Sequence, residues 1–169
     1  MISISDFPCV GFSGSRSLVG VSRPALVAAV RAVSPSASVV VGCAGGVDEF
    51  FGCQFPHRAR VFRASSFGSG RSSFARRSVA VVSAVAAAGG CWVSFPSSPC
   101  PAGVVPSSSS SRCFCGGGSG SWASLAYAAG CGVPCFVCLP AGVAAPPWLS
   151  SVGGGWFVTA PVPAQLSLL

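Results

Sequence analysis

A glycine-rich loop leads directly into an alanine-rich segment between Cys115 and Ala129, where the chain reads CGGGSGSWASLAYAA. The alanines predict a helix, and we expect Ser121 to cap its start. The first turn of a helix offers unpaired backbone N–H groups and the positive end of its dipole, and glycines let a phosphate approach closely. The segment therefore predicts a phosphate-binding loop. Glycines and serine caps also join strands to helices in many folds, so the motif alone leaves both interpretations open.

Two earlier loops carry glycine and serine in the same way. They run from Gly11 to Arg16 and from Gly42 to Asp48, and each follows a short apolar segment. In an open parallel sheet the ligand lies beyond the carboxyl ends of the strands, where these loops would meet. We therefore expect one pocket for a nucleotide-like ligand. The candidate binding residues are Gly14, Ser15, Arg16, Gly45, Gly46, Asp48, Gly117, Gly118, Ser119, Gly120, Ser121 and Trp122.

Asp48 and Glu49 are the acidic residues that border the expected pocket. Asp48 can hydrogen-bond a ribose hydroxyl, and either side chain can serve as a general base. Acidic residues in the first turn of a helix also stabilise its dipole, which is the simpler interpretation of Glu49. Trp122 can stack on a base or sugar, or pack in the core. No nucleophile with a fixed spacing accompanies His57, which we interpret as a solvated loop residue.

Short apolar runs alternate with segments of helical periodicity. The expected strands are Cys9 to Phe12, Ser38 to Cys43, Arg60 to Arg63, Cys91 to Phe95, Pro134 to Leu139 and Trp156 to Thr159. The expected helices begin near Ser22, Val47, Ser73 and Ser121. This alternation predicts an α/β fold with a doubly wound, mostly parallel sheet of five to six strands and helices on both faces. A single domain over residues 1–169 is expected.

The charge of the chain favours an anionic partner. The formal net charge is +7, all ten basic residues are arginines, and Asp6, Asp48 and Glu49 are the three acidic ones. The arginines are scattered and do not form the dense basic run of a dedicated nucleic-acid arm. Arginine grips phosphate with a planar fork, and a small ligand needs few such contacts. A nucleotide is therefore the first expectation and a nucleic acid the second.

The ten cysteines are interpreted as free thiols in a cytoplasmic protein, because no signal-peptide pattern opens the chain. The best metal candidate is the set Cys113, Cys115, Cys131, Cys135 and Cys138. Cys135 and Cys138 lie three residues apart on an expected strand, however, and should face opposite sides. We expect no metal and no resident cofactor. The apolar stretches Val79 to Phe95 and Trp122 to Leu149 are interrupted by glycine or proline, so no membrane span is expected.

Residues 96–112 are almost entirely serine, proline and small side chains. Such a composition predicts a flexible surface loop that can act as a lid. Residues 161–169 read as an extended C-terminal tail. Apolar side chains such as Phe50, Phe51 and Trp148 exceed what a small sheet must bury, which favours a homodimer.

Four segments resemble successive motifs of the SLOG superfamily, a Rossmann-like group that includes the DprA and Lonely Guy families. They read VGFSGSRS, VVVGCAGGVDEFF, FARRSVAVVSAV and GGGSGSWASLAYAAGCGVPCFV, and the resemblance spans Val10 to Pro140. It implies a nucleotide-derived ligand with Arg16 and the Arg76–Arg77 pair near its phosphate or ribose. In the Lonely Guy motif a proline and a glutamate stand where this chain has Gly116 and Ser124. In the DprA motif an arginine stands where this chain has Gly46.

Three functions remain open on the sequence. The first is a binding module or sensor for a nucleotide-like small molecule. The second is an enzyme that cleaves an N-glycosidic bond of a nucleotide, with Asp48 or Glu49 as the catalytic carboxylate. The third is a single-strand DNA binder of the DprA kind, which should show aromatic residues interleaved with arginines.

Overall fold

The computed structural model describes residues 2–116 and 118–159, so Gly117 and the predicted tail at 161–169 lie outside the described residues. The strands are β1 (Cys9–Gly14), β2 (Ser38–Gly42), β3 (Ala59–Phe62), β4 (Cys91–Phe95), β5 (Cys135–Cys138), β6 (Leu149–Gly153) and β7 (Trp156–Thr159). The helices are α1 (Arg23–Ala32), α2 (Val47–Gln54), α3 (Arg71–Ala87), α4 (Ser110–Cys113) and α5 (Gly120–Gly130), with 3-10 turns η1 (Ile4–Asp6) and η2 (Ala64–Phe67).

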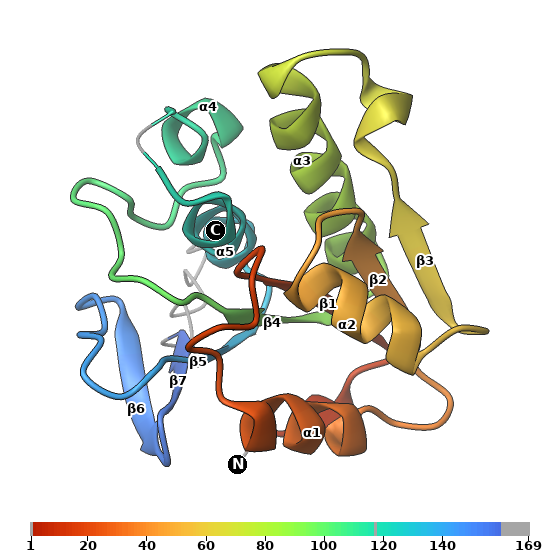
Figure 1. The fold of residues 1–169 in the computed structure, drawn as a ribbon, viewed down its shortest axis with the longest axis vertical. Helices are drawn as coiled ribbons and strands as arrows, with labels where there is room; N and C mark the ends of the chain where they lie inside the picture. Colours follow the sequence, from red (N-terminus) through yellow and green to blue (C-terminus); the bar gives the residue numbers. More distant parts are fainter. Residues whose placement is uncertain (1, 117, 160–169) are drawn as a thin grey trace, which may run out of the picture.

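The strands form one seven-stranded sheet in the order β3-β2-β1-β4-β5-β7-β6 (Figure 1). Strands β1 to β5 pair in parallel, whereas β7 is antiparallel to both β5 and β6. The predicted α/β class with a mostly parallel sheet is confirmed. The expected number of five to six strands was too low, because strand β6 was not predicted. Its sequence LSSVG is half polar and lacks a β-branched run.

The direction in which the sheet grows changes between β1 and β4. Strands β2 and β3 are added on one side of β1, and β4 and β5 are added on its other side. Loops that leave the carboxyl ends of β1 and β4 therefore run to opposite faces and open a crevice between them. This crevice is the place where the candidate site is found.

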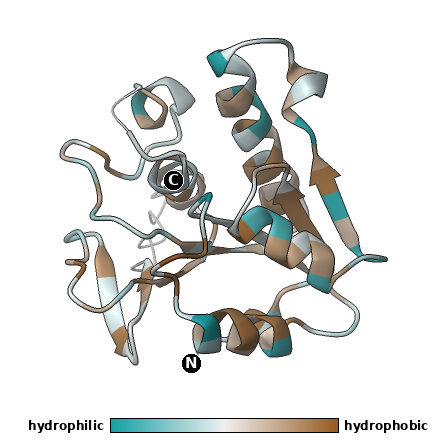
Figure 2. Cartoon of the chain, in the orientation of Figure 1, coloured by the Kyte–Doolittle hydropathy of each residue, from teal (hydrophilic) through white to brown (hydrophobic). Residues whose placement is uncertain are grey.

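Two apolar cores cover the two faces of the sheet. On one face Leu26 of α1 and Phe51 of α2 pack with Phe12 of β1, and the Phe12 and Phe51 rings stack at 3.7 Å. On the other face Val82 of α3 and Leu125 of α5 pack against the sheet. The central strands are correspondingly hydrophobic in Figure 2. Burial of a large apolar side chain stabilises the fold by about 1.5–3 kcal/mol, so these cores fix the layers.

Local signals explain where the helices begin and end. The Ser22 side chain accepts a hydrogen bond from the Ala25 N–H and caps α1. Gly89 follows α3 with a φ of +63°, the left-handed stop that the sequence predicts. At α5 the predicted cap was wrong by two residues: Ser119, not Ser121, accepts from the Trp122 N–H.

The serine- and proline-rich stretch at 96–112 lies along α5. It contains the start of the short helix α4, and Val104 is buried. The Ser107 N–H donates to the Ala126 carbonyl of α5 at 3.3 Å. A side chain at Gly130 would overlap the Ser107 backbone, so this glycine permits the close approach. The stretch therefore has contacts with the core at several points.

Candidate functional site

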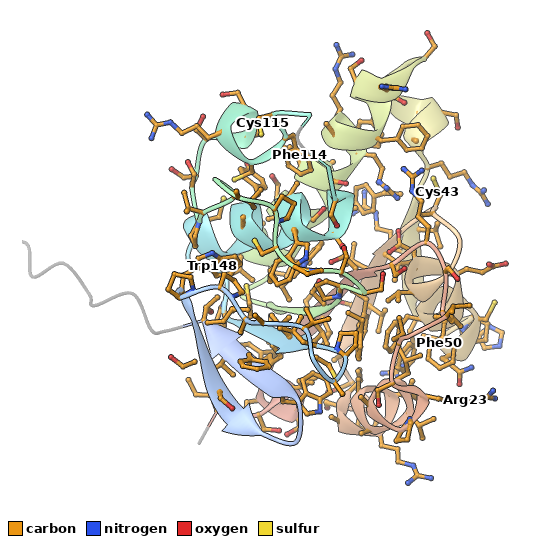
Figure 3. The ribbon with its side chains drawn as sticks, turned by 60° about the vertical axis from the view of Figure 1, so that its left-hand side comes forward. Arg23, Cys43, Phe50, Phe114, Cys115 and Trp148 are labelled. Carbon is orange, nitrogen blue, oxygen red and sulfur yellow. The ribbon has the colours of Figure 1, made fainter. Side chains whose placement is uncertain are left out.

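A pocket of about 740 Å³ opens at the carboxyl ends of the central strands, between α3 and α5. We call it the site pocket. Ser15 and Arg16 line it from the loop after β1, and Asp48 lines it from α2. The start of α5 and the Cys115–Gly116 connection form another wall. Figure 3 shows Phe114 and Cys115 on the α4 side and Cys43 on the β2 side of the molecule. The volume of the site pocket is typical of a small-molecule site.

Backbone hydrogen bonds join the loops that border the site pocket. The Ser15 N–H donates to the Phe95 carbonyl, and the Val47 N–H donates to the Ser15 carbonyl, each at 3.0 Å. The Ser97 hydroxyl donates to the Ser15 hydroxyl at 3.0 Å. Gly46 has a φ of +72°, and a side chain there would overlap the Ser15 carbonyl. The loops after β1, β2 and β4 are therefore held together through Ser15.

Asp48 and Arg77 form an ion pair inside the site pocket. Arg77 Nη1 donates to Asp48 Oδ2 at 3.3 Å, and both side chains are more than nine-tenths buried. The pair occupies the space above Gly42, where any side chain would overlap the guanidinium and the carboxylate. Among the described residues, the buried Nε of Arg77 has no hydrogen-bond partner. Arg77 therefore lines the pocket as a buried cation whose Nε is covered by protein atoms.

Burial raises the pKa of Asp48 from 3.8 to about 6. Four influences lower this pKa: the charge of Arg77, the hydrogen bond from the Ala44 N–H at 3.4 Å, the hydrogen bond from Arg77, and the charge of Arg16. Together these influences lower the pKa of Asp48 by less than burial raises it. Asp48 can therefore exchange a proton near neutral pH, as a general acid or base must.

The start of α5 presents its backbone and two hydroxyls to the site pocket. Gly118, Ser119, Gly120 and Ser121 all line it. The Ser119 and Ser121 hydroxyls lie 2.7 Å apart, and Ser119 also caps the helix. The helix has eleven residues, so its dipole adds a positive potential at this end. On the opposite wall the Arg16 guanidinium lies 5.4 Å from the centre of the Phe74 ring.

The structure brings together eight of the residues that the sequence analysis named for ligand binding. They are Ser15, Arg16, Asp48, Arg77, Gly118, Ser119, Gly120 and Ser121. Gly14, Gly45 and Gly46 shape the loops but do not line the pocket. Arg76 points elsewhere, since its Nη1 donates to the Phe67 carbonyl at 3.3 Å. Glu49 is exposed and outside the pocket, which agrees with the helix-dipole interpretation.

Trp122 does not line the site pocket. Its ring is fully buried, meets the Trp148 ring edge to face at 6.0 Å, and donates its Nε1–H to the Ser98 carbonyl at 2.8 Å. Trp122 therefore cannot stack on a ligand in the site pocket. Its ring packs in the core, which was the other interpretation of this residue. The residue lies three positions after the cap Ser119, in the first turn of α5, and its side chain packs in the core on that face of the sheet.

Several pocket residues were missed by the sequence analysis. Ser13 is a polar residue on a buried strand, and its hydroxyl accepts a hydrogen bond from Trp92 at 3.1 Å. Arg71 and Phe74 line the pocket from the first turn of α3. A polar residue that interrupts an apolar strand, as Ser13 does, is a usable signal. The other two give no local signal, because only the packing of α3 brings them to the pocket.

Cys135 and Cys138 lie on opposite faces of β5, one in each apolar core, as the strand geometry predicts. Within residues 2–116 and 118–159 there is no group of three or more candidate metal ligands. His57 is exposed and lies outside the site pocket. Of the helices that the structure describes, none combines the length and apolarity needed to cross a bilayer.

No protein-family model matches the chain, and neither the curated proteins nor the solved structures contain a match to it.

Proposed function

We propose that the chain binds a nucleotide or nucleotide-derived ligand in the site pocket, as a binding module or sensor. One observation carries the proposal: the glycine and serine loops meet around a pocket that is lined by Arg16, Arg71 and the buried Arg77. In this proposal the phosphate lies at the start of α5, near Arg16 and Arg71. Backbone N–H groups, hydroxyls and guanidinium groups are the donors that phosphates prefer.

A doubly wound Rossmann arrangement and membership of the SLOG superfamily belong to the same proposal. Support comes from the parallel strand order β3-β2-β1-β4-β5 and from the reversal between β1 and β4. The loops that resemble SLOG motifs after β1, after β2 and before α5 border this reversal. Ligands of open α/β sheets bind at such a position.

Hydrolysis of a nucleotide N-glycosidic bond is the second candidate, favoured by Asp48. Its carboxyl group lines the site pocket with a pKa raised to about 6, which suits proton transfer near neutral pH. Incubation with AMP and chromatography for free adenine tests this activity. Release of adenine by the wild type and none by Asp48→Asn supports the enzyme, and no release by either protein excludes it for that substrate.

Thermal unfolding with AMP, GMP, CMP and UMP tests the binding proposal. A nucleotide at a hundredfold excess over its Kd should raise the Tm by roughly 5 to 10 °C, because it binds only the folded chain. The variant R16A/R71A removes two exposed arginines that line the site pocket and should weaken binding at least tenfold. R23A/R31A removes the same charge from α1 and serves as the matched control.

Figure 3 shows that Arg23 projects from α1 at the end of the molecule remote from Phe114 and Cys115. The control variant should therefore bind as the wild type does. Equal losses in both double variants would show that only net charge matters. The absence of any Tm shift with the nucleotides and with ADP-ribose would refute the proposed function.

A further inference from the structure

A small polar cluster lies on the sheet at the floor of the site pocket. Ser13 of β1 and Ser94 of β4 are register partners, and their hydroxyl oxygens lie 3.1 Å apart. The Trp92 indole Nε1–H donates to Ser13 Oγ at 3.1 Å. Ser13 lines the pocket and is 8% exposed, whereas Ser94 is 0% exposed. Ser13 and Trp92 therefore line the pocket, whereas Ser94 is sealed beneath it.

The hydrogens of this cluster can be assigned by asking which donors find acceptors. An indole N–H can only donate, so Ser13 Oγ must accept from Trp92. Ser94 Oγ has Ser13 Oγ as its one hydrogen-bond partner among the described residues. If Ser13 donated to Ser94, the Ser94 hydrogen would be buried without an acceptor, which folded proteins avoid.

The opposite direction satisfies every buried donor. Ser13 Oγ has two lone pairs and can accept from Trp92 and Ser94 together. Its own hydrogen then points away from both residues, toward the side on which Ser13 lines the pocket. The buried network thus fixes a hydroxyl donor at the pocket floor.

We infer that Ser13 donates a hydrogen bond into the site pocket and selects ligands that place an acceptor atom at its floor. The inference rests on the proposed function for the class of ligand and deepens it. The phosphate end belongs with the exposed Arg16 and Arg71, so the uncharged end of the nucleotide reaches the floor between Val81 and Trp92. A base with a carbonyl oxygen at that point accepts from Ser13, whereas an exocyclic amino group can only donate.

The Arg77 guanidinium of α3 lies close to the same part of the floor. Phe12 and Val41 are register partners, so Ser13 lies beside Gly42, over which the Arg77 guanidinium stands. The Nε of Arg77 is itself covered by protein atoms, so the guanidinium contributes positive charge beside the floor. A carbonyl oxygen at the floor therefore meets the Ser13 hydroxyl next to this cation.

Neutron diffraction from deuterium-exchanged crystals of the ligand-free protein tests the donor direction without any ligand. We expect the Ser94 deuteron to lie on the line to Ser13 Oγ and the Ser13 deuteron to point into the pocket. A Ser13 deuteron on the line to Ser94 overturns the inference. This result does not depend on whether the protein binds nucleotides.

Binding of IMP and AMP tests the selection, since these probes carry a carbonyl oxygen and an amino group at the same ring position. We expect IMP to bind about fivefold more tightly, as a neutral hydrogen bond permits. Ser13→Ala should abolish this preference, and Ser94→Ala should reduce it, because Ser13 then has a free lone pair that can accept from the amino group of AMP. Equal affinity of the wild type for IMP and AMP refutes the selection. If neither binds but the deuterons lie as expected, the floor donor stands and its role in selecting nucleotides is refuted, and the thermal-unfolding series decides the proposed function separately.

Discussion

Replacement of Asp48 by asparagine separates two opposite views of the buried ion pair. Asp48 and Arg77 lie 3.3 Å apart, and a buried pair is commonly expected to lose stability when one partner is removed. Burial nevertheless raises the pKa of Asp48 from 3.8 to about 6, so loss of solvent outweighs the attraction of Arg77. The ionised carboxylate is then less favourable in the fold than a neutral group of the same shape. We expect Asp48→Asn to stabilise the protein at pH 7.

The magnitude follows from the two pKa values of Asp48. Between 3.8 and about 6 the folded state holds a proton that the unfolded state has lost. The wild-type free energy of unfolding therefore falls as the pH rises through this window. Each pKa unit corresponds to 1.36 kcal/mol, so the rise from 3.8 to about 6 corresponds to about 3 kcal/mol. Asparagine resembles the protonated carboxyl group, and the variant should lack this loss.

Urea unfolding followed by tryptophan fluorescence at several pH values between 3.5 and 8 measures the effect. The difference between variant and wild type cancels the titration of all other groups. It should be small below pH 3.8, grow through pH 6, and level off near 3 kcal/mol in favour of Asp48→Asn. A difference that grows in favour of the wild type would show that Arg77 stabilises the ionised carboxylate by more than burial costs. The reasoning about the pair would then be wrong.

Two further substitutions test how the site pocket is built. Gly42→Ala places a methyl group where the Arg77 and Asp48 side chains meet, so we expect the pair to separate and urea unfolding to show a loss of about 1–3 kcal/mol; unchanged stability with an intact pair in a crystal structure would contradict this. Ser119→Ala removes the cap of α5 and should lower the free energy of unfolding by about 1 kcal/mol, while Ser121→Ala is the matched control and should cost less; equal losses would show that Ser119 is not the cap.

The parallel part of the fold could be predicted because buried strands form short apolar runs in the sequence. Cys91–Phe95 matches its predicted bounds, and Ser38–Gly42 differs from its predicted range by a single residue. Each of these strands is buried on both faces, so composition alone marks it. The opposite faces of Cys135 and Cys138 follow from strand periodicity in the same way. Strand β6 has one buried residue and four exposed ones, and it is paired only by β7, so no local pattern marks it.

The candidate site could also be predicted only in part. The loops after β1 and β2 and before α5 could be expected to meet, because the edge of a parallel sheet collects them. The partner of Asp48 was not deduced, since Arg77 lies 29 positions further along the chain and meets it only through packing of α3. The core position of Trp122 depends on the phase of α5, and the cap at Ser119 shifts that phase by two residues from the expected start.

The ion pair also links protons to the charge of the site pocket. With Asp48 ionised the pair is neutral, and the pocket attracts anions chiefly through the exposed Arg16 and Arg71. When Asp48 takes up a proton, the buried Arg77 remains as an uncompensated cation beside the pocket. An anionic ligand held at the start of α5 would disfavour the ionised carboxylate and raise the pKa of Asp48 further. Occupancy by such an anion and protonation of Asp48 therefore favour each other, because linkage between two binding equilibria is reciprocal.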